Sequence, residues 1–288
     1  QGEANLGIPA WLAAVEADLD KALASGIPIR QVVMGRCCAI DSMMEALFEL
    51  YELDQTDLTL FATGGYGRGE LHPFSDVDLL LLSPNPIDES LNQKISPFVA
   101  KLWDIGIDPA LVVRSVEECD EACHDDITVA TSLLEARILA GNVAQAGLPM
   151  QLLNKNWSQT KFYEAKMAEA KERYVKHNST EYNLEPDLKN APGGLRDIHT
   201  VGWISKRYFR VTNLFGLVQQ EFITEKEFDE LQEAEDFLWL IRHHLHKIAK
   251  RNENRVLFDY QRLIAERIGY RDNSHPNAAV EHFMRDYY

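Results

Sequence analysis

The stretch GGYGRGELHPFSDVDLLLL, residues 64–82, decides the fold of this chain. It opens with Gly64 and Gly65, runs through ten further residues, and reaches Asp76-Val-Asp78 at the head of four leucines. Such a continuous apolar run predicts a strand that is buried on both faces. Alternation along that strand places the side chains of Asp76 and Asp78 on the same face. Two carboxylates so close together repel each other, so the sequence predicts a compensating cation beside them.

The flanking sequence predicts a small sheet with helices around it, followed by a block that is almost entirely helical after Val116. We expect strands at 57–65, 76–82 and 108–115, and helices at 9–24, 28–53 and 88–105. The fold class is therefore α+β: a small mixed β-sheet domain flanked by helices, followed by an all-α helical domain. We place the first domain at residues 1–150 and the second at 151–288.

The clearest helix of the second domain covers residues 224–250. Thr224 and Glu227 have the spacing of a capping box. Apolar residues then recur at steps of three and four residues, which predicts a face packed in the core: Leu231, Ala234, Leu238, Ile241, Leu245 and Ile248.

Composition excludes several classes of protein. The 288 residues are 45% hydrophobic and carry a net charge of −16, whereas binding to nucleic acid requires a basic surface. No apolar run reaches the roughly 18 residues of a membrane span, and the sequence shows no signal peptide. The four cysteines are sparse, as in a reducing compartment. We therefore expect a cytoplasmic protein with neither a nucleic-acid nor a membrane partner.

The paired glycines and the paired aspartates together indicate phosphate chemistry. Glycines allow a bulky anion to approach backbone N–H groups. Mg²⁺ is held by one or two carboxylates together with the phosphates of a substrate. Nucleotidyl transfer uses these parts. The alternative is that Gly64 and Gly65 form only a tight turn and that Asp76 caps another turn after Ser75.

Two glycines, ten residues and Asp-x-Asp on a strand resemble the DNA polymerase β-like nucleotidyltransferase superfamily. The full stretch is similar to one of its branches, the bacterial PII uridylyltransferase/uridylyl-removing enzymes. Three further stretches support that branch: DITVATSLLEARILAG (126–141), YNLEPDLKNAPGGLRDIHTVGWISKRYF (182–209) and FLWLIRHHLHKIAKRNENRVLFDYQRLIAERIGY (237–270). The resemblance runs from about residue 30 to FMRDYY at the end, about where the HD domain of that family begins. It therefore concerns the transferase part, without the HD hydrolase and ACT regulatory domains.

The resemblance implies an enzyme that transfers UMP from UTP to a tyrosine of the nitrogen-signalling protein PII and releases pyrophosphate. Asp76 and Asp78 would then hold Mg²⁺, and Gly64 and Gly65 would face the triphosphate. Asp108 is the candidate for the third carboxylate of the superfamily, which acts on the attacking hydroxyl. Its alternative role is that of a turn residue.

Four further residues are candidates for binding the nucleotide. Arg68 either contacts phosphate oxygens or pairs with Glu70, and Ser75 is placed to orient the metal or a phosphate. Lys189 and Arg196 flank an apparent helix start at Pro-Gly-Gly, where an anion can bind. The alternative for this last region is a rigid turn with a charged surface.

Other functions stay open at this point. The predicted metal site does not determine which base the nucleotide carries. Adenylyl or other nucleotidyl transfer to a different protein or small molecule is therefore an alternative. A non-catalytic nucleotide-binding regulatory module is a third possibility, although the intact Gly-Gly and Asp-x-Asp argue against it.

Overall fold

A computed structural model describes residues 3–177, 183–211, 213–271, 274–275 and 277–288. The chain divides into two compact units, Gln1–Ser158 and Gln159–Tyr288. This division lies eight residues beyond the expected position 150, because helix α7 (Leu148–Asn156) packs against helices of the first unit. The indole Nε1 of Trp157 also donates a hydrogen bond of 2.6 Å to the carbonyl of Cys123.

The first unit alternates helices and strands. Its elements are α1 (Glu3–Ala24), α2 (Ile29–Leu50), η1 (Leu53–Gln55), β1 (Thr59–Ala62), α3 (Gly64–Gly67), β2 (Val77–Ser83), α4 (Glu89–Asp104), β3 (Pro109–Ser115), α5 (Val116–Asp125), α6 (Ile127–Leu134), β4 (Arg137–Gly141), η2 (Val143–Gln145) and α7. The three predicted strands are present as β1, β2 and β3. The first helix starts earlier than expected, at Glu3, with Pro9 inside it.

The four strands form one mixed sheet in the order β3-β2-β1-β4. β2 pairs with β1 in antiparallel fashion and with β3 in parallel. Leu79, Leu80, Leu81 and Leu82 are all buried, as the unbroken apolar run predicts. The structure therefore confirms a small mixed sheet flanked by helices.

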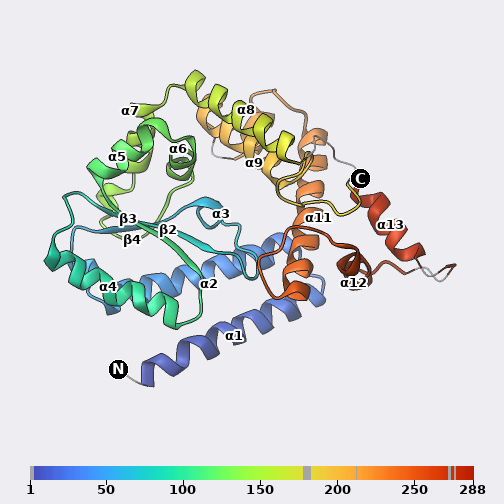
Figure 1. The fold of residues 1–288 in the computed structure, drawn as a ribbon, viewed down its shortest axis with the longest axis horizontal. Coiled ribbons are helices and arrows are strands. Elements are labelled where there is room, and N and C mark those ends of the chain that lie inside the picture. Colours follow the sequence, from blue (N-terminus) through green and yellow to red (C-terminus); the bar gives the residue numbers. More distant parts are fainter. Residues whose placement is uncertain (1–2, 178–182, 212, 272–273, 276) are drawn as a thin grey trace. The chain divides into compact units, whose positions relative to one another are not determined.

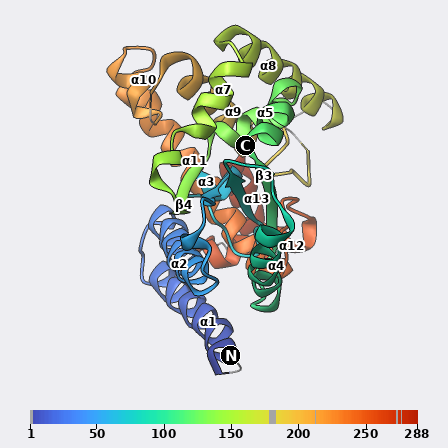
Figure 2. The same cartoon turned by 90° about the vertical axis from the view of Figure 1, so that its left-hand side faces the viewer.

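The sheet lies between two layers of helices. Leu79 and Leu81 belong to the main core, which also contains apolar residues of α2 and α4. α5 and α6 lie on the opposite side of the sheet from these two helices (Figure 1), and the perpendicular view agrees for α5 (Figure 2). Since side chains alternate along a strand, Asp78 faces the α5–α6 layer when Leu79 faces the core.

Strand β4 corrects the expectation that the chain is almost only helical after Val116. Residues 137–141 pair with β1 in antiparallel fashion. Arg137 also donates to Asp41, through Nη1 at 2.8 Å and Nη2 at 3.1 Å. Gly141 has a φ of +98°, and a β-carbon there would lie 2.2 Å from the carbonyl oxygen of Leu58. These are contacts with distant parts of the chain, which local periodicity does not report.

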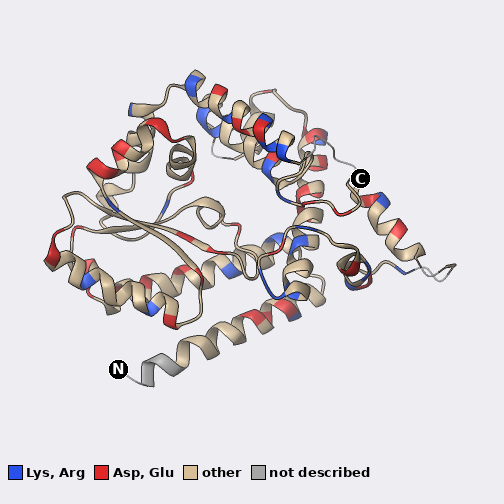
Figure 3. Ribbon diagram, viewed as in Figure 1, with Lys and Arg blue, Asp and Glu red and all other residues tan. Residues whose placement is uncertain are grey.

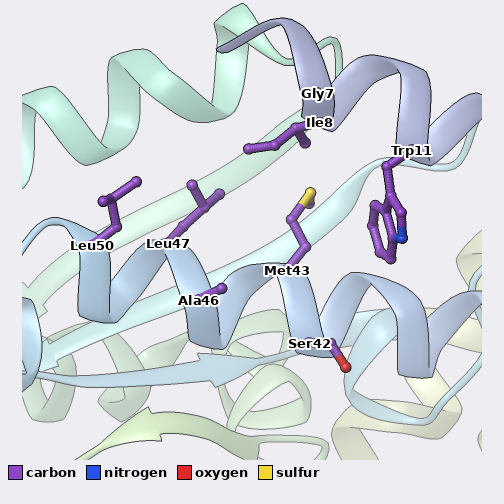
Figure 4. Close-up of a pocket in the computed structure, with 8 residues that line it drawn as sticks. All are labelled: Gly7, Ile8, Trp11, Ser42, Met43, Ala46, Leu47 and Leu50. Atoms are coloured by element: carbon purple, nitrogen blue, oxygen red, sulfur yellow. The ribbon is translucent and has the colours of Figure 1, made fainter. Parts of the chain in front are cut away.

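Helices α1 and α2 leave an apolar pocket of about 330 Å³ between them. Figure 4 shows Ile8 and Trp11 of α1 facing Met43 and Leu47 of α2. Ile8 also packs on the core beneath the sheet.

The regular elements among the described residues of the second unit are helices, and an isolated antiparallel bridge joins Asp187 and Arg255. The elements of this unit are α8 (Gln159–Lys176), α9 (Leu195–Ile204), a π-helical turn η3 (Ser205–Phe209), α10 (Phe215–Gln219), α11 (Glu225–Ala249), α12 (Phe258–Ile268) and α13 (Ala278–Tyr287). Basic and acidic residues alternate along α8 (Figure 3). Within the described residues, none of the helices combines the length and apolar character needed to cross a membrane.

The capping box predicted at the start of α11 is present. The N–H of Glu227 donates to Oγ1 of Thr224 at 3.2 Å, and the N–H of Thr224 donates to Oε2 of Glu227 at 2.8 Å. Of the apolar stripe that follows, Leu238, Ile241 and Leu245 are buried. Leu231 and Ile248 are half-buried and Ala234 is exposed, so the helix is anchored in the core along its C-terminal half.

Candidate functional site

The paired glycines and the second aspartate lie side by side. The N–H of Thr63, at the end of β1, donates to the backbone carbonyl of Asp78 at 3.0 Å. Gly64 follows with a φ of +54°, and a β-carbon there would lie 2.2 Å from Oδ2 of Asp78. Glycine is therefore the residue that fits at this position, both for its backbone angle and for the space beside the carboxylate.

The turn that contains the glycines is held closely on several sides. A β-carbon on Gly65 would lie 3.2 Å from the carbonyl oxygen of Glu70. One on Gly67 would lie 2.4 Å from the carbonyl oxygen of Glu135 and 2.9 Å from that of Ala62. The backbone of α3 thus runs against β1 on one side and against the end of α6 on another.

The three predicted carboxylates come from the starts of two neighbouring strands. Asp78 lies opposite Ala110 in the parallel pair of β2 and β3. The N–H of Val77 donates to the carbonyl of Asp108 at 2.9 Å, so Asp108 precedes β3 at the level where Asp76 precedes β2. Asp76 and Asp108 are exposed, and Asp78 is half-buried.

Two of these carboxylates suit a hard cation whose other ligands come from a substrate. In the described part of the chain, no three His, Cys, Asp or Glu side chains are grouped as a ready metal site. Asp76 and Asp78 therefore remain the predicted pair of metal ligands, and glycine at position 64 lets the Asp78 carboxylate lie against the backbone of the turn.

Arg68 lies between two carboxylates. Its Nη2 donates to Oε2 of Glu70 at 2.7 Å, and its Nη1 donates to Oε1 of Glu135. The side chains of Arg68 and Glu135 are 13% and 3% exposed. Burial by itself lowers the pKa of the Arg68 guanidinium, but the attraction of both carboxylates outweighs it and raises that pKa. Of the two roles predicted for Arg68, the structure shows the ion pair that braces the loop, and it adds Glu135, which the sequence did not single out.

A second network holds the same turn from the side of α2. The hydroxyl of Tyr66 donates to Oδ1 of Asp41 at 2.6 Å, and Arg137 binds both oxygens of Asp41. Arg137 also donates to the backbone carbonyl of Tyr66 at 3.3 Å. Burial, followed by the hydrogen bond to Asp41, raises the pKa of the Tyr66 phenol. The glycine turn is thus tied to α2 and β4 through Tyr66.

Ser75 precedes Asp76 directly. Its N–H donates to the carbonyl of His72 at 3.2 Å. Its Oγ is buried and has no hydrogen-bond partner among the described residues. A buried hydroxyl without a partner is costly, which keeps the prediction that Ser75 binds a ligand at this site.

A cavity of about 520 Å³ adjoins Asp78 on the α5–α6 side of the sheet. Its lining comes from the ends of β1 and β2, from β3, α5 and α6: Thr63, Asp78, Leu79, Leu80, Pro109, Ala110, Leu111, Val112, Arg114, Cys119, Thr128, Val129, Ser132 and Leu133. Sequence reasoning missed Arg114. The available signal is its even spacing from Asp108, which places both residues on one face of the strand.

The predicted residues Lys189 and Arg196 belong to the second unit, where Lys189 precedes α9 and Arg196 lies in its first turn. The N–H of Gly193 donates to Oδ2 of Asp197 at 2.7 Å, and Arg173 donates to Oδ1 of Asp197 at 2.6 Å. The guanidinium carbon of Arg196 lies 5.3 Å from the centre of the Trp203 ring. A carboxylate of the chain itself therefore occupies this helix start, and nucleotide binding by Lys189 and Arg196 stays a prediction.

Two sequence families match the chain. Residues 43–132 match the family described as "Nucleotidyltransferase domain", and residues 161–288 match "GlnD PII-uridylyltransferase". The second of these matches begins close to the start of the second unit. Tyr182, which opens one of the stretches that carry the resemblance, lies outside the described residues.

Curated relatives extend the match over nearly the whole chain. A bifunctional uridylyltransferase/uridylyl-removing enzyme of Psychrobacter sp. (strain PRwf-1) is 60% identical over 286 residues, which are 99% of this chain and 32% of that protein. Proteins of the same name are 58% identical in Psychrobacter arcticus and 49% identical in Acinetobacter baumannii (strain ATCC 17978), over 98% and 96% of this chain and 31% and 32% of theirs.

A solved structure titled "Crystal structure of the toxin-antitoxin with AMP-PNP" matches 46% of this chain, and the match spans 95% of that structure's own chain. The two are 15% identical, and the TM-score is 0.27. The chain spans about a third of the length of the curated relatives. With the sheet, the glycine turn and the aspartates in place, the chain contains a nucleotidyltransferase domain and is related to about one third of the length of the bifunctional uridylyltransferase/uridylyl-removing enzymes.

Proposed function

We propose that this chain transfers UMP from UTP to a tyrosine hydroxyl of the signalling protein PII and releases pyrophosphate. The observation that carries the proposal is the contact between Gly64 and Asp78, where an added β-carbon would fall 2.2 Å from Oδ2. A backbone that allows a phosphate to approach and a carboxylate that can hold a cation are adjacent there. The names of the relatives favour uridylyl as the group transferred.

Asp76 and Asp78 would hold Mg²⁺, since both precede or begin the same strand and hard oxygen ligands suit that ion. When bound, the ion offsets negative charge on the phosphates of the nucleotide. The N–H groups of the glycine turn would face the triphosphate, and Ser75 Oγ would donate to an oxygen at the same edge. Arg68, held by Glu70 and Glu135, keeps the turn in this position.

Asp108 would take the proton from the attacking hydroxyl. It lies at the head of β3, at the same level as Asp76 on the neighbouring strand. Its exposure leaves it accessible to an acceptor that arrives from solvent. A carboxylate in that place raises the nucleophilicity of the hydroxyl as the new bond to phosphorus forms.

The test mixes the full chain with PII, Mg²⁺ and UTP and measures the mass of PII. An increase of one UMP is expected, and Asp76→Asn and Asp78→Asn should each abolish it. Asp104→Asn, a change at another exposed aspartate of the same unit, is the matched control and should label normally.

Parallel reactions with ATP, CTP and GTP decide the base. Labelling by ATP in preference to UTP would identify an adenylyl transferase instead. A chain that binds nucleotide and labels nothing with any of the four would be the regulatory module.

A further inference from the structure

The order of the strands places the glycine turn and Asp108 on different sides of the paired aspartates. The glycine turn follows β1, the aspartates stand on β2, and Asp108 precedes β3. Since β2 lies between β1 and β3, the glycines and Asp108 are on opposite sides of the Asp76–Asp78 pair. A nucleotide held at this pair therefore has one side toward β1 and the other toward β3.

Transfer at a phosphorus atom proceeds in line, with the attacking and leaving oxygens on opposite sides. If the pyrophosphate end lies over the glycine turn, as the proposed function holds, it leaves on the β1 side. The attacking hydroxyl must then arrive on the β3 side. The cavity of about 520 Å³ reaches Asp78, and β3 and the α5–α6 layer supply most of its lining.

The walls of this cavity suit an aromatic side chain with its peptide. Ala110, Val112 and Arg114 alternate with their neighbours on β3, and Ala110 lies opposite Asp78 in register. Leu133 of α6 lines the facing wall. Arg114 lies four steps along the strand from Ala110, about 13 Å away. The cavity is thus acidic at the Asp78 end and basic at Arg114, with apolar side chains and the hydroxyls of Thr128 and Ser132 between them.

We propose that this cavity, the acceptor groove, binds the hydroxyl-bearing aromatic side chain of the acceptor protein and the segment next to it. The proposal rests on the proposed function. In it the phenol oxygen bonds to the α-phosphorus of the nucleotide while the bond from that phosphorus to the bridging oxygen of pyrophosphate breaks. The phenol proton goes to Asp108, and the electron pair leaves with pyrophosphate. Arg114 at the far end pairs with a carboxylate of the acceptor segment.

The test fills the groove and separates the two substrates. Val112 is 41% exposed, so Val112→Trp adds bulk without disturbing the core. We expect the KM for PII to rise about tenfold or more, with UTP affinity in the absence of PII unchanged. Arg114→Ala, which removes bulk, should also raise the KM for PII. Val143→Trp, at a valine that is 76% exposed outside the groove, is the matched control.

Each outcome decides between defined alternatives. A Val112→Trp chain that melts like the wild type and labels PII with the wild-type KM overturns the acceptor groove alone. Loss of UTP affinity with an unchanged KM for PII assigns the cavity to the nucleotide and overturns the proposal as well. If Val112→Trp unfolds, the KM for PII and the affinity for UTP of Arg114→Ala decide between the same alternatives. If the wild-type chain transfers none of the four nucleotides to PII, the proposed function is refuted, and the acceptor groove with it.

Discussion

The β-carbon that Gly64 lacks would fall 2.2 Å from Oδ2 of Asp78. Gly64 begins α3 just after β1, and Asp78 belongs to β2; the N–H of Thr63 holds the two segments together by donating to the backbone carbonyl of Asp78 at 3.0 Å. The backbones of Gly64 and Asp78 therefore cannot move apart without breaking the pairing of β1 and β2, whereas the Asp78 side chain can still rotate. Gly64 therefore provides the space in which the Asp78 carboxylate lies, and Asp78 provides the negative charge of the site.

Gly64→Ala should abolish transfer while the chain stays folded. The added methyl displaces the Asp78 carboxylate, and a loss of about 100-fold or more in kcat/KM is expected from such misplacement. The measurement is the rate of UMP incorporation into PII together with thermal melting.

Gly69→Ala is the matched control for backbone strain. Gly69 has a φ of +81°, yet a β-carbon there meets nothing within 4 Å. A cost of about 1 kcal/mol in folding free energy is expected from the positive φ, with catalysis retained. Equal losses of activity in both variants would show that the contact with Asp78 is not the cause.

Asp108→Asn tests the third carboxylate. As an acceptor of the hydroxyl proton, Asp108 should contribute roughly 10²–10⁴-fold to kcat. The variant should keep its affinity for UTP and its melting temperature while kcat falls. A residue that served only to start β3 would instead lower the melting temperature and leave kcat nearly unchanged.

Glu135→Gln should destabilise the first unit. Arg68 is 13% exposed and pairs with Glu135 and Glu70, so the change removes one carboxylate from a buried guanidinium. Breaking a buried pair costs about 3 kcal/mol in unfolding free energy. Denaturant titration measures it. Asp18→Asn, which removes an ion pair to Lys21 with both side chains 76% exposed, should leave the midpoint unchanged.

Adjacent cysteines should differ in reactivity and in their effect on stability. Burial, the largest cause, raises the pKa of Cys37 from 9.0 to about 12, whereas Cys38 is exposed. At pH 8 a thiol reagent should modify Cys38 quickly and Cys37 slowly, and Cys38→Ser should remove the fast phase. Fast modification that survives in Cys38→Ser would contradict the burial of Cys37.

The same shift predicts how stability depends on pH. Between pH 9 and 12 the folded chain keeps the Cys37 proton and the unfolded chain loses it. The unfolded state then binds fewer protons, so the unfolding free energy falls as pH rises through this window. The contribution is fully present below pH 9. Cys37→Ala should show a shallower fall over the same range in denaturant titrations.

The sequence by itself determined the central strand and the residues at its head. The four leucines require burial on both faces, the paired glycines end the preceding strand, and the two aspartates alternate onto one face. The capping box of α11 was equally readable, because Thr224 and Glu227 are three residues apart and bond each other. These features depend on neighbours along the chain, and local spacing reports them.

Only the tertiary structure decided the partner of Arg68, the identity of β4 and the cavity beside Asp78. Arg68 meets Glu135 across 67 residues of sequence, and Asp41 meets Arg137 across 96. Residues 137–141 become a strand because β1 offers them an edge, although the residues before them favour a helix. Contacts of this kind depend on the path of the whole chain, and their energy outweighs the local preference of a five-residue segment.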